Sequence, residues 1–390
     1  MIGLGIECTA HTLGIGIVKN EKIIANEKDT YTTNHGGIVP IEAAKHHEKV
    51  FDDILNKALD KSKIKLDNLD FISLSIGPGL SPCLLVGLRK MKELAKRLKI
   101  PVVPVNHCIA HLEIGRITGA KNPVLLYASG ANTQIIAYEA GKYRIFGETL
   151  DLGVGNFIDT FARYIGLGFP GGSKVEQLAL QSKNYVELPY TVKGMDIALS
   201  GILTNLKQKI ERMNKFNISP STDSPTNSHP GFDINDQKLA KVKMLARPNE
   251  INKENNPSSL LSSSQKSRAK RDNIVEYSKE DLAFSMQETV FAMLVEVAER
   301  ALAHVGKKEL VLGGGVACNS RFQEMCKIMC KERGAKMYVP ERPLLVDNGA
   351  MIAYLGEIMY KSGIKFKGKA IEKLDIMPRQ RTDDVLVDWK

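Results

Sequence analysis

The chain has 390 residues and 43% hydrophobic content, so it can bury a substantial core, and roughly 150 residues per domain suggests two or three lobes. No window approaches the roughly 20 continuous apolar residues that span a bilayer, and the N-terminus lacks the features of a secretory signal, so we expect a soluble intracellular protein without a membrane partner. The formal net charge of +10 is compatible with a nucleic-acid partner, although many basic proteins bind none.

The first 30 residues predict a three-stranded meander. Apolar runs at 2–7, 13–18 and 23–30 have strand character and are separated by the small polar turn CTAHT and by KNEK. The same order of strand, small polar turn, strand, turn and strand recurs at 124–150. An offset of about 120 residues between the two meanders indicates a duplication rather than a short-period repeat.

Helices with one apolar stripe follow the first meander, at 42–62 and 84–98. A long helix at 279–304 precedes the apolar strand ELVLGGG. This alternation predicts an α/β protein with a two-lobed actin-like or sugar-kinase fold (the ASKHA, ribonuclease-H-like class) and a ligand between the lobes. We expect residues 1–118 and 350–390 in the N-terminal lobe and 119–349 in the C-terminal lobe. The Asn-, Ser- and Pro-rich stretch 214–275 predicts a disordered insertion in the second lobe.

The six cysteines are scattered without the paired short spacing of a zinc site, which predicts reduced thiols. Cys326 and Cys330 lie four apart on a predicted helix, where small buried hydrophobic residues explain them better than a metal or redox role does.

A histidine pair with helical spacing is the first candidate for a site. His107 and His111 would project from one helix face and could share a metal, although two partly exposed polar residues at a helix start would look the same. A metalloprotease is excluded because Cys108 occupies the position of its catalytic glutamate. Tyr127 and Asp347 could complete an N and O ligand set suited to iron or zinc, while a helix cap is the alternative role of Asp347.

Three small-residue turns, at 8–12, 129–133 and 313–319, could bring backbone N–H groups close to a phosphate. A nucleotide or acyl phosphate is the ligand that they predict. Glu176 follows a Pro-Gly-Gly turn and is expected in the first turn of a helix, where it would either stabilise the helix dipole or bind a ligand hydroxyl. Asp159 has the same two interpretations.

Several long motifs resemble the universal tRNA threonylcarbamoyladenosine synthase family in its archaeal and eukaryotic branch. They are NHCIAHLEIGR, YASGANTQ, YRIFGETLDLGVGNFIDTFAR, ELPYTVKGMDIALSG, SMQETVFAML, GGGVACN and DNGAMIA, which occur in the family's order and cover nearly everything except the insertion. The resemblance implies a metal-dependent transferase. It would move threonylcarbamoyl from L-threonylcarbamoyl-AMP to N6 of adenosine 37, in tRNAs that read codons beginning with adenine, and release AMP.

The resemblance also implies roles for residues at matching positions. One divalent metal, iron or zinc, would be bound by His107, His111, Tyr127 and Asp347. The substrate would contact Tyr127, Ala128, Ser129, Gly130, Ala131, Asp159, Gly172, Glu176 and Asn319. The family acts on tRNA within the KEOPS assembly, beside a small atypical protein kinase, expected here as a separate polypeptide, and a small dimer-forming subunit. We expect a cytoplasmic location, with a nuclear pool if the source is eukaryotic.

Three positions depart from the family pattern. Ala131 and Cys8 replace usual glycines, and Ala131 would crowd a ligand if its φ were positive. Leu85 replaces a common arginine. Two other functions remain open from the sequence, which are an ATPase or kinase of the same superfold and a non-catalytic tRNA-binding scaffold.

Overall fold

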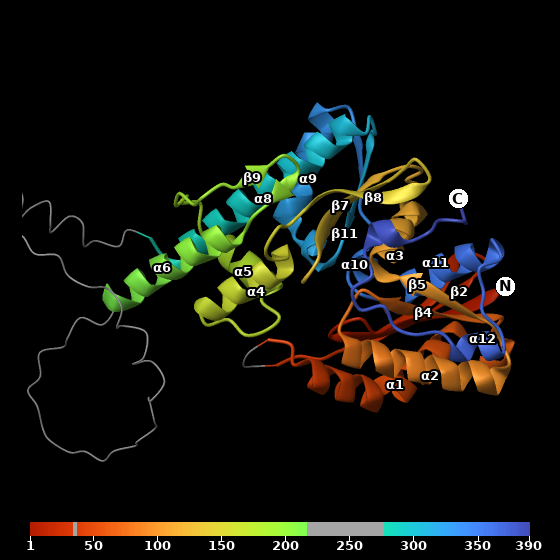
Figure 1. Cartoon of the computed structure of the whole chain (residues 1–390). Coiled ribbons are helices and arrows are strands. Elements are labelled where there is room, and N and C mark those ends of the chain that lie inside the picture. Colours follow the sequence, from red (N-terminus) through yellow and green to blue (C-terminus); the bar gives the residue numbers. More distant parts are fainter. Residues whose placement is uncertain (34–36, 217–276) are drawn as a thin grey trace, which may run out of the picture. The chain divides into compact units, whose positions relative to one another are not determined.

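The computed structural model describes residues 1–33, 37–216 and 277–390, whose chain trace is coloured along the sequence in Figure 1. The chain separates into two compact units, Met1–Ile210 with Tyr277–Lys390, and Glu211–Glu276. All the strands described below belong to the first unit. Helix α6 (Ser200–Phe216) continues past 214, where the insertion was predicted to begin. The rest of that predicted insertion, 217–275, lies outside the described residues.

The first sheet has five strands in the order β3-β2-β1-β4-β5. Their bounds are β1 Ile2–Glu7, β2 Thr12–Lys19, β3 Lys22–Thr30, β4 Phe71–Gly77 and β5 Val102–Asn106. Strands β1 to β3 form an antiparallel meander, and β4 and β5 extend the sheet parallel to β1. Helices α1 (Pro40–Ser62) and α2 (Ser81–Leu98) cover one face, and α11 (Gly349–Lys361) covers the other (Figure 1).

The second sheet repeats this arrangement in the order β12-β11-β6-β7-β8. Its strands are β6 Val124–Ala128, β7 Thr133–Glu139, β8 Lys142–Glu148, β11 Glu309–Gly313 and β12 Lys336–Tyr338. Strands β6 to β8 form the meander, and β11 and β12 run parallel to β6. The duplication predicted from the two meanders is therefore confirmed.

The remaining elements connect or cover the two sheets. The helices are α3 His107–Ile114, α4 Val154–Tyr164, α5 Gly172–Ala179, α8 Lys279–His304, α9 Ser320–Glu332, α10 Arg342–Leu345 and α12 Lys369–Glu372. Short 3-10 turns are η1 Leu66–Asn68, η2 Gly115–Thr118, η3 Gly315–Cys318 and η4 Thr382–Asp384, and a two-stranded sheet pairs β9 Val192–Lys193 with β10 Asp196–Ile197. Helix α8 begins where predicted, because Ser278 and Asp281 form a capping box.

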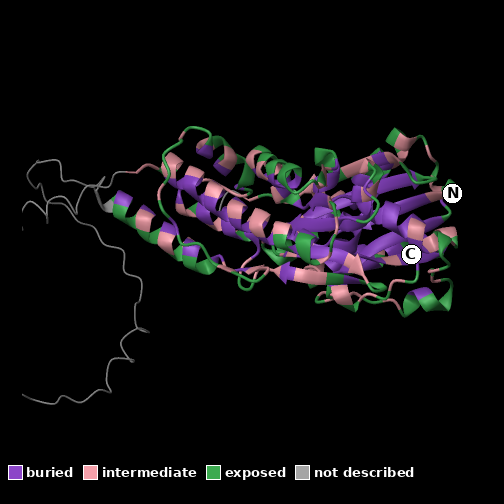
Figure 2. Ribbon diagram, turned by 90° about the horizontal axis from the view of Figure 1, so that it is seen from above, coloured by how far each residue is buried: buried purple, intermediate pink, exposed green. Residues whose placement is uncertain are grey.

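The buried residues concentrate along the strands of both sheets and along the helices packed on them (Figure 2). Close contact between α11 and the first sheet depends on residues without a side chain. A Cβ built on Gly16 would lie only 2.2 Å from Ala350 N, so no larger residue fits there without moving the helix. Helix α11 is thereby held directly on β1 and β2, close to the loop that carries Asp347.

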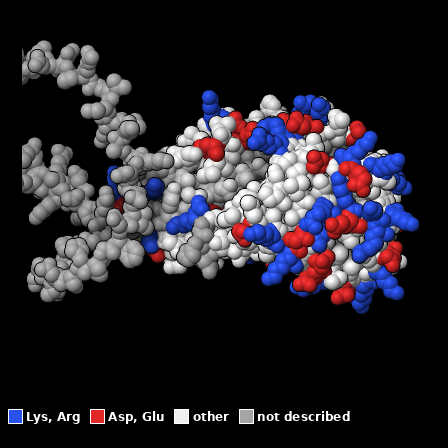
Figure 3. All heavy atoms as spheres, turned by 60° about the horizontal axis from the view of Figure 1, so that its bottom comes forward, with Lys and Arg blue, Asp and Glu red and all other residues white. Residues whose placement is uncertain are grey.

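The surface charges do not form a single basic patch on the face shown in Figure 3. Lys and Arg side chains are intermixed there with Asp and Glu. Several of the protein's acidic and basic side chains form ion pairs, such as Lys61 with Glu27 and Lys90 with Glu48. All six cysteines lie in the described residues and are free. Within the described ranges, no helix combines the length and apolar character needed to cross a bilayer.

Candidate metal centre

Helix α3 carries two members of the predicted ligand set. Asn106, the last residue of β5, caps this helix because its Oδ1 accepts a hydrogen bond from Ile109 N at 3.1 Å. The helix therefore starts at His107, and the four-residue spacing brings His111 to the same face one turn later. The two residues are only 5% and 1% exposed. The alternative interpretation, a partly exposed polar pair, is therefore wrong.

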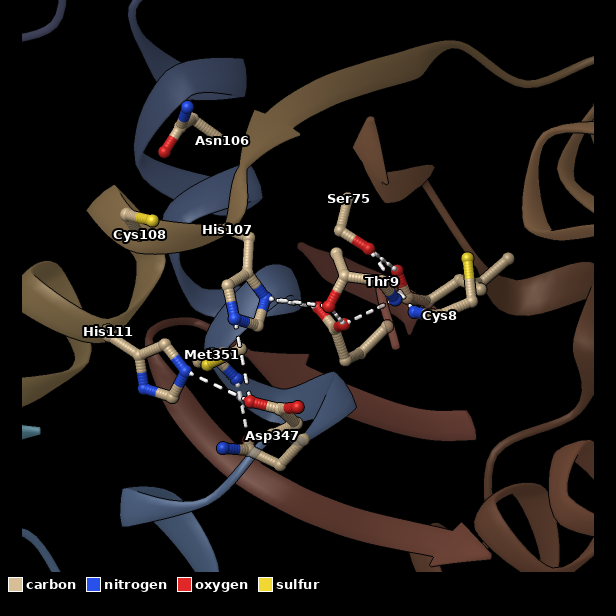
Figure 4. A network of polar contacts seen from close by, with 12 residues as sticks. Cys8, Thr9, Ser75, Asn106, His107, Cys108, His111, Asp347 and Met351 are labelled. Atoms are coloured by element: carbon tan, nitrogen blue, oxygen red, sulfur yellow. Dashed lines mark hydrogen bonds and ion pairs between the residues drawn. The ribbon is translucent and has the colours of Figure 1, made fainter. Parts of the chain in front are cut away.

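Four potential ligand atoms converge where α3, the end of β6 and the loop before α11 meet. His107 Nε2 lies 3.1 Å from Tyr127 Oη and 3.4 Å from Asp347 Oδ1. His111 Nε2 lies 3.3 Å from the same Asp347 oxygen, although 236 positions separate these two residues in the chain. Figure 4 shows both imidazole rings directed at the Asp347 carboxylate. The fold thus brings together the four residues that the sequence offered as a possible ligand set.

Asp347 does not cap the helix that follows it. The cap of α11 is Asn348, whose Oδ1 accepts a hydrogen bond from Met351 N at 2.9 Å. Capping was the alternative role for Asp347, and this geometry excludes it. The carboxylate is instead free to face the two histidines.

The spacing of these atoms fits a bound metal. Ligand atoms about 2.1 Å from a tetrahedral ion lie about 3.4 Å from one another, and the three contacts given above, at 3.1 to 3.4 Å, are close to that value. Two imidazole nitrogens with carboxylate and phenol oxygens make a donor set suited to iron or zinc. His107, His111 and Asp347 also form a three-residue group whose ligand atoms all lie within 4.8 Å of one another. The group is therefore a candidate metal site.

Burial and charge set the protonation states of the cluster. Burial disfavours a charge on His107, but the charges of Glu7 and Asp347 outweigh it and raise the pKa of His107 to about 9. Burial opposes ionisation of Asp347 as well, yet His107 and His111 lower the pKa of its carboxyl well below the usual value. Burial lowers the pKa of His111 and raises the pKa of Tyr127 well above its usual value. The nearby charges therefore shift the pKa values of His107 and Asp347 in opposite directions.

A fifth residue at this site, Glu7, was not singled out from the sequence. It is the last residue of β1, is fully buried, and its Oε2 lies 2.9 Å from His107 Nδ1. The signal that could have found it is its position. Glu7, His107 and Tyr127 all lie at the carboxyl ends of strands that run parallel to a neighbour, β1, β5 and β6, which is where open α/β sheets bind ligands.

The residues predicted around the adenylate form a second group. Asp159 on α4 accepts a hydrogen bond from Gly171 N at 2.7 Å, and burial raises the pKa of its carboxyl. Asn319 caps α9 and donates to Gln287 Oε1 at 2.8 Å. Gly172 begins α5 beside open space, because nothing lies within 4 Å of a Cβ built there.

Glu176 links α5 to α9. It is the fifth residue of α5, so its predicted position in the first turn of that helix is wrong. Its Oε1 instead accepts hydrogen bonds from Ser320 N at 2.8 Å and Ser320 Oγ at 2.7 Å. The carboxylate therefore stabilises the N-terminus of a different helix, next to Asn319.

The predicted small-residue turns each follow a strand. Ser129 O and Gly130 O accept hydrogen bonds from Gly155 N and Asn156 N, both at 2.9 Å, which fixes the second turn on α4. Ala131 is exposed and has no positive φ, so its methyl group is not strained. Cys8 is fully buried, and its side chain packs toward Gly87 of α2. Leu85, also on α2, is 50% exposed.

These features define an α/β protein with duplicated sheets of the actin-like class and a buried N and O metal-type cluster at the carboxyl ends of its strands. The crystal structure of T. kodakarensis HypF supports the fold, with a TM-score of 0.55 at 13% identity. That match covers 93% of this chain and 48% of the HypF chain, so the chain spans about half of it.

The family of this chain follows from sequence comparison. The model of the tRNA N6-adenosine threonylcarbamoyltransferase family matches residues 21–354. A protein of that name from Thermococcus kodakarensis is 46% identical over 389 residues, which cover 100% of both chains. A Methanosarcina mazei protein named "Probable bifunctional tRNA threonylcarbamoyladenosine biosynthesis protein" is 43% identical, and the match covers 99% of this chain and 59% of that protein. The chain belongs to the tRNA N6-adenosine threonylcarbamoyltransferase family, and the family and enzyme class expected from its motifs are confirmed.

Proposed function

We propose that this chain transfers the threonylcarbamoyl group of L-threonylcarbamoyl-AMP to N6 of adenosine 37 in tRNA, at a metal bound by His107, His111, Tyr127 and Asp347. Family membership supports the reaction. The observation that carries the choice of site is the buried convergence of the four ligand atoms, which are linked by three contacts of 3.1 to 3.4 Å. Iron and zinc are the metals that this donor set favours.

The reaction forms one bond and breaks another. The exocyclic N6 of adenosine attacks the carbamoyl carbon and loses a proton, and the bond from that carbon to the phosphate oxygen breaks, so that AMP leaves. Because the phosphate already activates the carbonyl, the protein has to orient the substrate and stabilise developing charge rather than supply a nucleophile. When bound, the metal supplies a Lewis acid and a template for that orientation.

The second turn and the α4–α5–α9 region would hold the substrate. Residues 127–131 lie directly beside the metal ligands, since Tyr127 belongs to both sets. Asp159, Gly172, Glu176 and Asn319 would surround the adenylate part. The open space beside Gly172 and the polar groups of Glu176 and Asn319 support a hydroxyl-rich ligand there.

Partners and location belong to the same proposal. We expect tRNA as the macromolecular substrate, in a KEOPS-type complex with a small atypical protein kinase and a small dimer-forming subunit, in the cytoplasm. The word "bifunctional" in the name of the Methanosarcina relative supports a second activity in close association. The packing of α11 on the first sheet supports lobes made of 1–118 with 350–390 and of 119–349.

The test is a transfer assay. Metal-loaded protein, its partner subunits, L-threonylcarbamoyl-AMP and unmodified tRNA are incubated, and the digested nucleosides are analysed by mass spectrometry. Wild type should form threonylcarbamoyladenosine, whereas a His107→Ala/His111→Ala variant should not. His304→Ala changes an exposed histidine at the end of α8 and should retain activity. Equal product from the double variant would remove the metal assignment, and no product from wild type with active partners would refute the reaction.

A further inference from the structure

We propose that Glu7 is a positioning residue, which accepts a hydrogen bond from His107 Nδ1–H and so directs His107 Nε2 at the metal. The proposal rests on the metal centre described above. Glu7 lies 100 residues from His107 in the chain, at the end of β1, and its side chain is fully buried. Burying a carboxylate costs free energy unless hydrogen-bond donors or positive charges compensate for the lost water.

Both carboxylate oxygens of Glu7 are held by donors. Oε1 accepts hydrogen bonds from Thr9 N at 2.8 Å and from Thr9 Oγ1 at 2.5 Å. Oε2 lies 2.9 Å from His107 Nδ1. In Figure 4, one dashed line runs from the His107 ring toward the side of Thr9, and another runs from the ring to Asp347. The carboxylate is therefore fixed in orientation before any metal binds.

This contact determines the tautomer of His107. Because a carboxylate only accepts hydrogen bonds, the proton of the neutral imidazole must sit on Nδ1. The lone pair is then on Nε2, the atom that lies 3.1 Å from Tyr127 Oη and 3.4 Å from Asp347 Oδ1. A carboxylate behind a ligating histidine fixes the ring and increases its basicity.

The second histidine has no such support. Among the described residues, His111 Nδ1 is buried without a hydrogen-bond partner. Of the two imidazoles, His107 has a carboxylate at its Nδ1 and His111 has no partner there in the described part of the chain, so removing Glu7 should affect His107 selectively. Glu7 and Asp347 together also bring two negative charges to the site, which a divalent cation with neutral histidines and tyrosine would balance.

The decisive variant is Glu7→Gln. Its amide oxygen can still accept from Thr9, but its NH₂ group then faces His107 Nδ1 and donates to it, which moves the ring proton to Nε2. We expect the Zn²⁺ affinity, measured by competition with a chelator, to fall about 10- to 100-fold. In histidine-labelled, Zn²⁺-loaded protein, a long-range ¹H–¹⁵N spectrum should show wild-type His107 protonated at Nδ1. The variant should lose that signature.

Glu113→Gln is the matched control. Glu113 is a fully buried carboxylate on the same helix, but it contacts Tyr143 Oη at 2.5 Å and Arg116 at 3.0 Å instead of the metal ligands. This variant loses the same buried charge as Glu7→Gln. Because Glu113 does not contact the metal ligands, it should leave the Zn²⁺ affinity and the His107 signature unchanged. Equal losses in both variants would show a general effect of removing a buried charge and would overturn the role of Glu7.

A second variant covers the case in which Glu7→Gln does not fold. Glu7→Asp keeps the negative charge, but its side chain is one methylene shorter, so the carboxylate lies farther from His107 Nδ1. It should therefore also weaken Zn²⁺ binding. Wild-type affinity in either Glu7 variant would overturn the proposal. The His107→Ala/His111→Ala protein separates this result from a failure of the metal centre. If it too binds Zn²⁺ like wild type, the metal is not at this site at all.

Discussion

Cys8 and Gly87 should be energetically coupled, because the Cys8 thiol fills the space that a side chain at position 87 would need. A Cβ built on Gly87 would lie 2.1 Å from Cys8 Sγ and 3.0 Å from Leu74 Cδ1. Overpacking of this kind costs about 1–3 kcal/mol, so Gly87→Ala should lower the free energy of unfolding by that amount. In a Cys8→Gly background the thiol is absent, and the same methyl group should be tolerated.

A double-mutant cycle measures this dependence. Urea unfolding followed by circular dichroism of wild type, Gly87→Ala, Cys8→Gly and the double variant should give a coupling energy of about 0.5–3 kcal/mol, typical of residues in contact. The control is Ala95→Gly, on the same helix, which should lose the same stability in the wild-type and Cys8→Gly backgrounds. If Gly87→Ala lowers the free energy of unfolding equally in both backgrounds, the Cys8 thiol does not limit the side chain at position 87, and the predicted coupling is refuted.

Three further outcomes are expected. Burial lowers the pKa of His47, whose Nε2 donates to Ala10 O at 3.0 Å, to about 4. Between about pH 6.5 and 4 the unfolded chain therefore binds more protons than the folded protein. As the pH falls over that range, wild type should lose about 3 kcal/mol of stability relative to His47→Gln. A stability difference that is constant with pH would contradict this prediction. Zn²⁺ at 100 times its dissociation constant should stabilise wild type by about 2.7 kcal/mol in thermal unfolding, and an equal gain in Asp347→Asn would exclude that ligand. Cys318 is the one cysteine of the six that is not buried, so an alkylating reagent should modify it first, as detected by mass spectrometry. Earlier labelling of Cys326 would contradict the packing of α9.

Local sequence patterns predicted the elements well. Helix α8 has the predicted bounds 279–304, and both meanders form in the predicted order. These features depend on neighbours in the sequence, where periodicity and capping act. The predicted start of the insertion, at residue 214, falls inside α6, because the composition becomes polar before that helix ends at Phe216. Helix ends are set by local competition that composition does not resolve.

The site was predictable only in part. His107 and His111 were recognisable because one helix turn separates them, whereas Tyr127 and Asp347 were only possible additional ligands until the family motifs assigned them to the same set. Glu7 gave no periodic or motif signal, since its role depends on pairing between β1, β4 and β5. Glu176 was assigned to its own helix, but its carboxylate contacts Ser320, 144 residues away. Contacts between distant segments depend on tertiary packing that a single sequence does not display.

The central claim is that the cluster of His107, His111, Tyr127 and Asp347 holds a metal required for threonylcarbamoyl transfer. The most direct test removes the metal with a chelator, restores it as Zn²⁺ or Fe²⁺, and measures threonylcarbamoyladenosine in tRNA with partner subunits present. Wild type should lose the activity and regain it, whereas Asp347→Asn should remain inactive after metal is restored. Full activity in chelated wild type, with no metal found by elemental analysis, would contradict the claim.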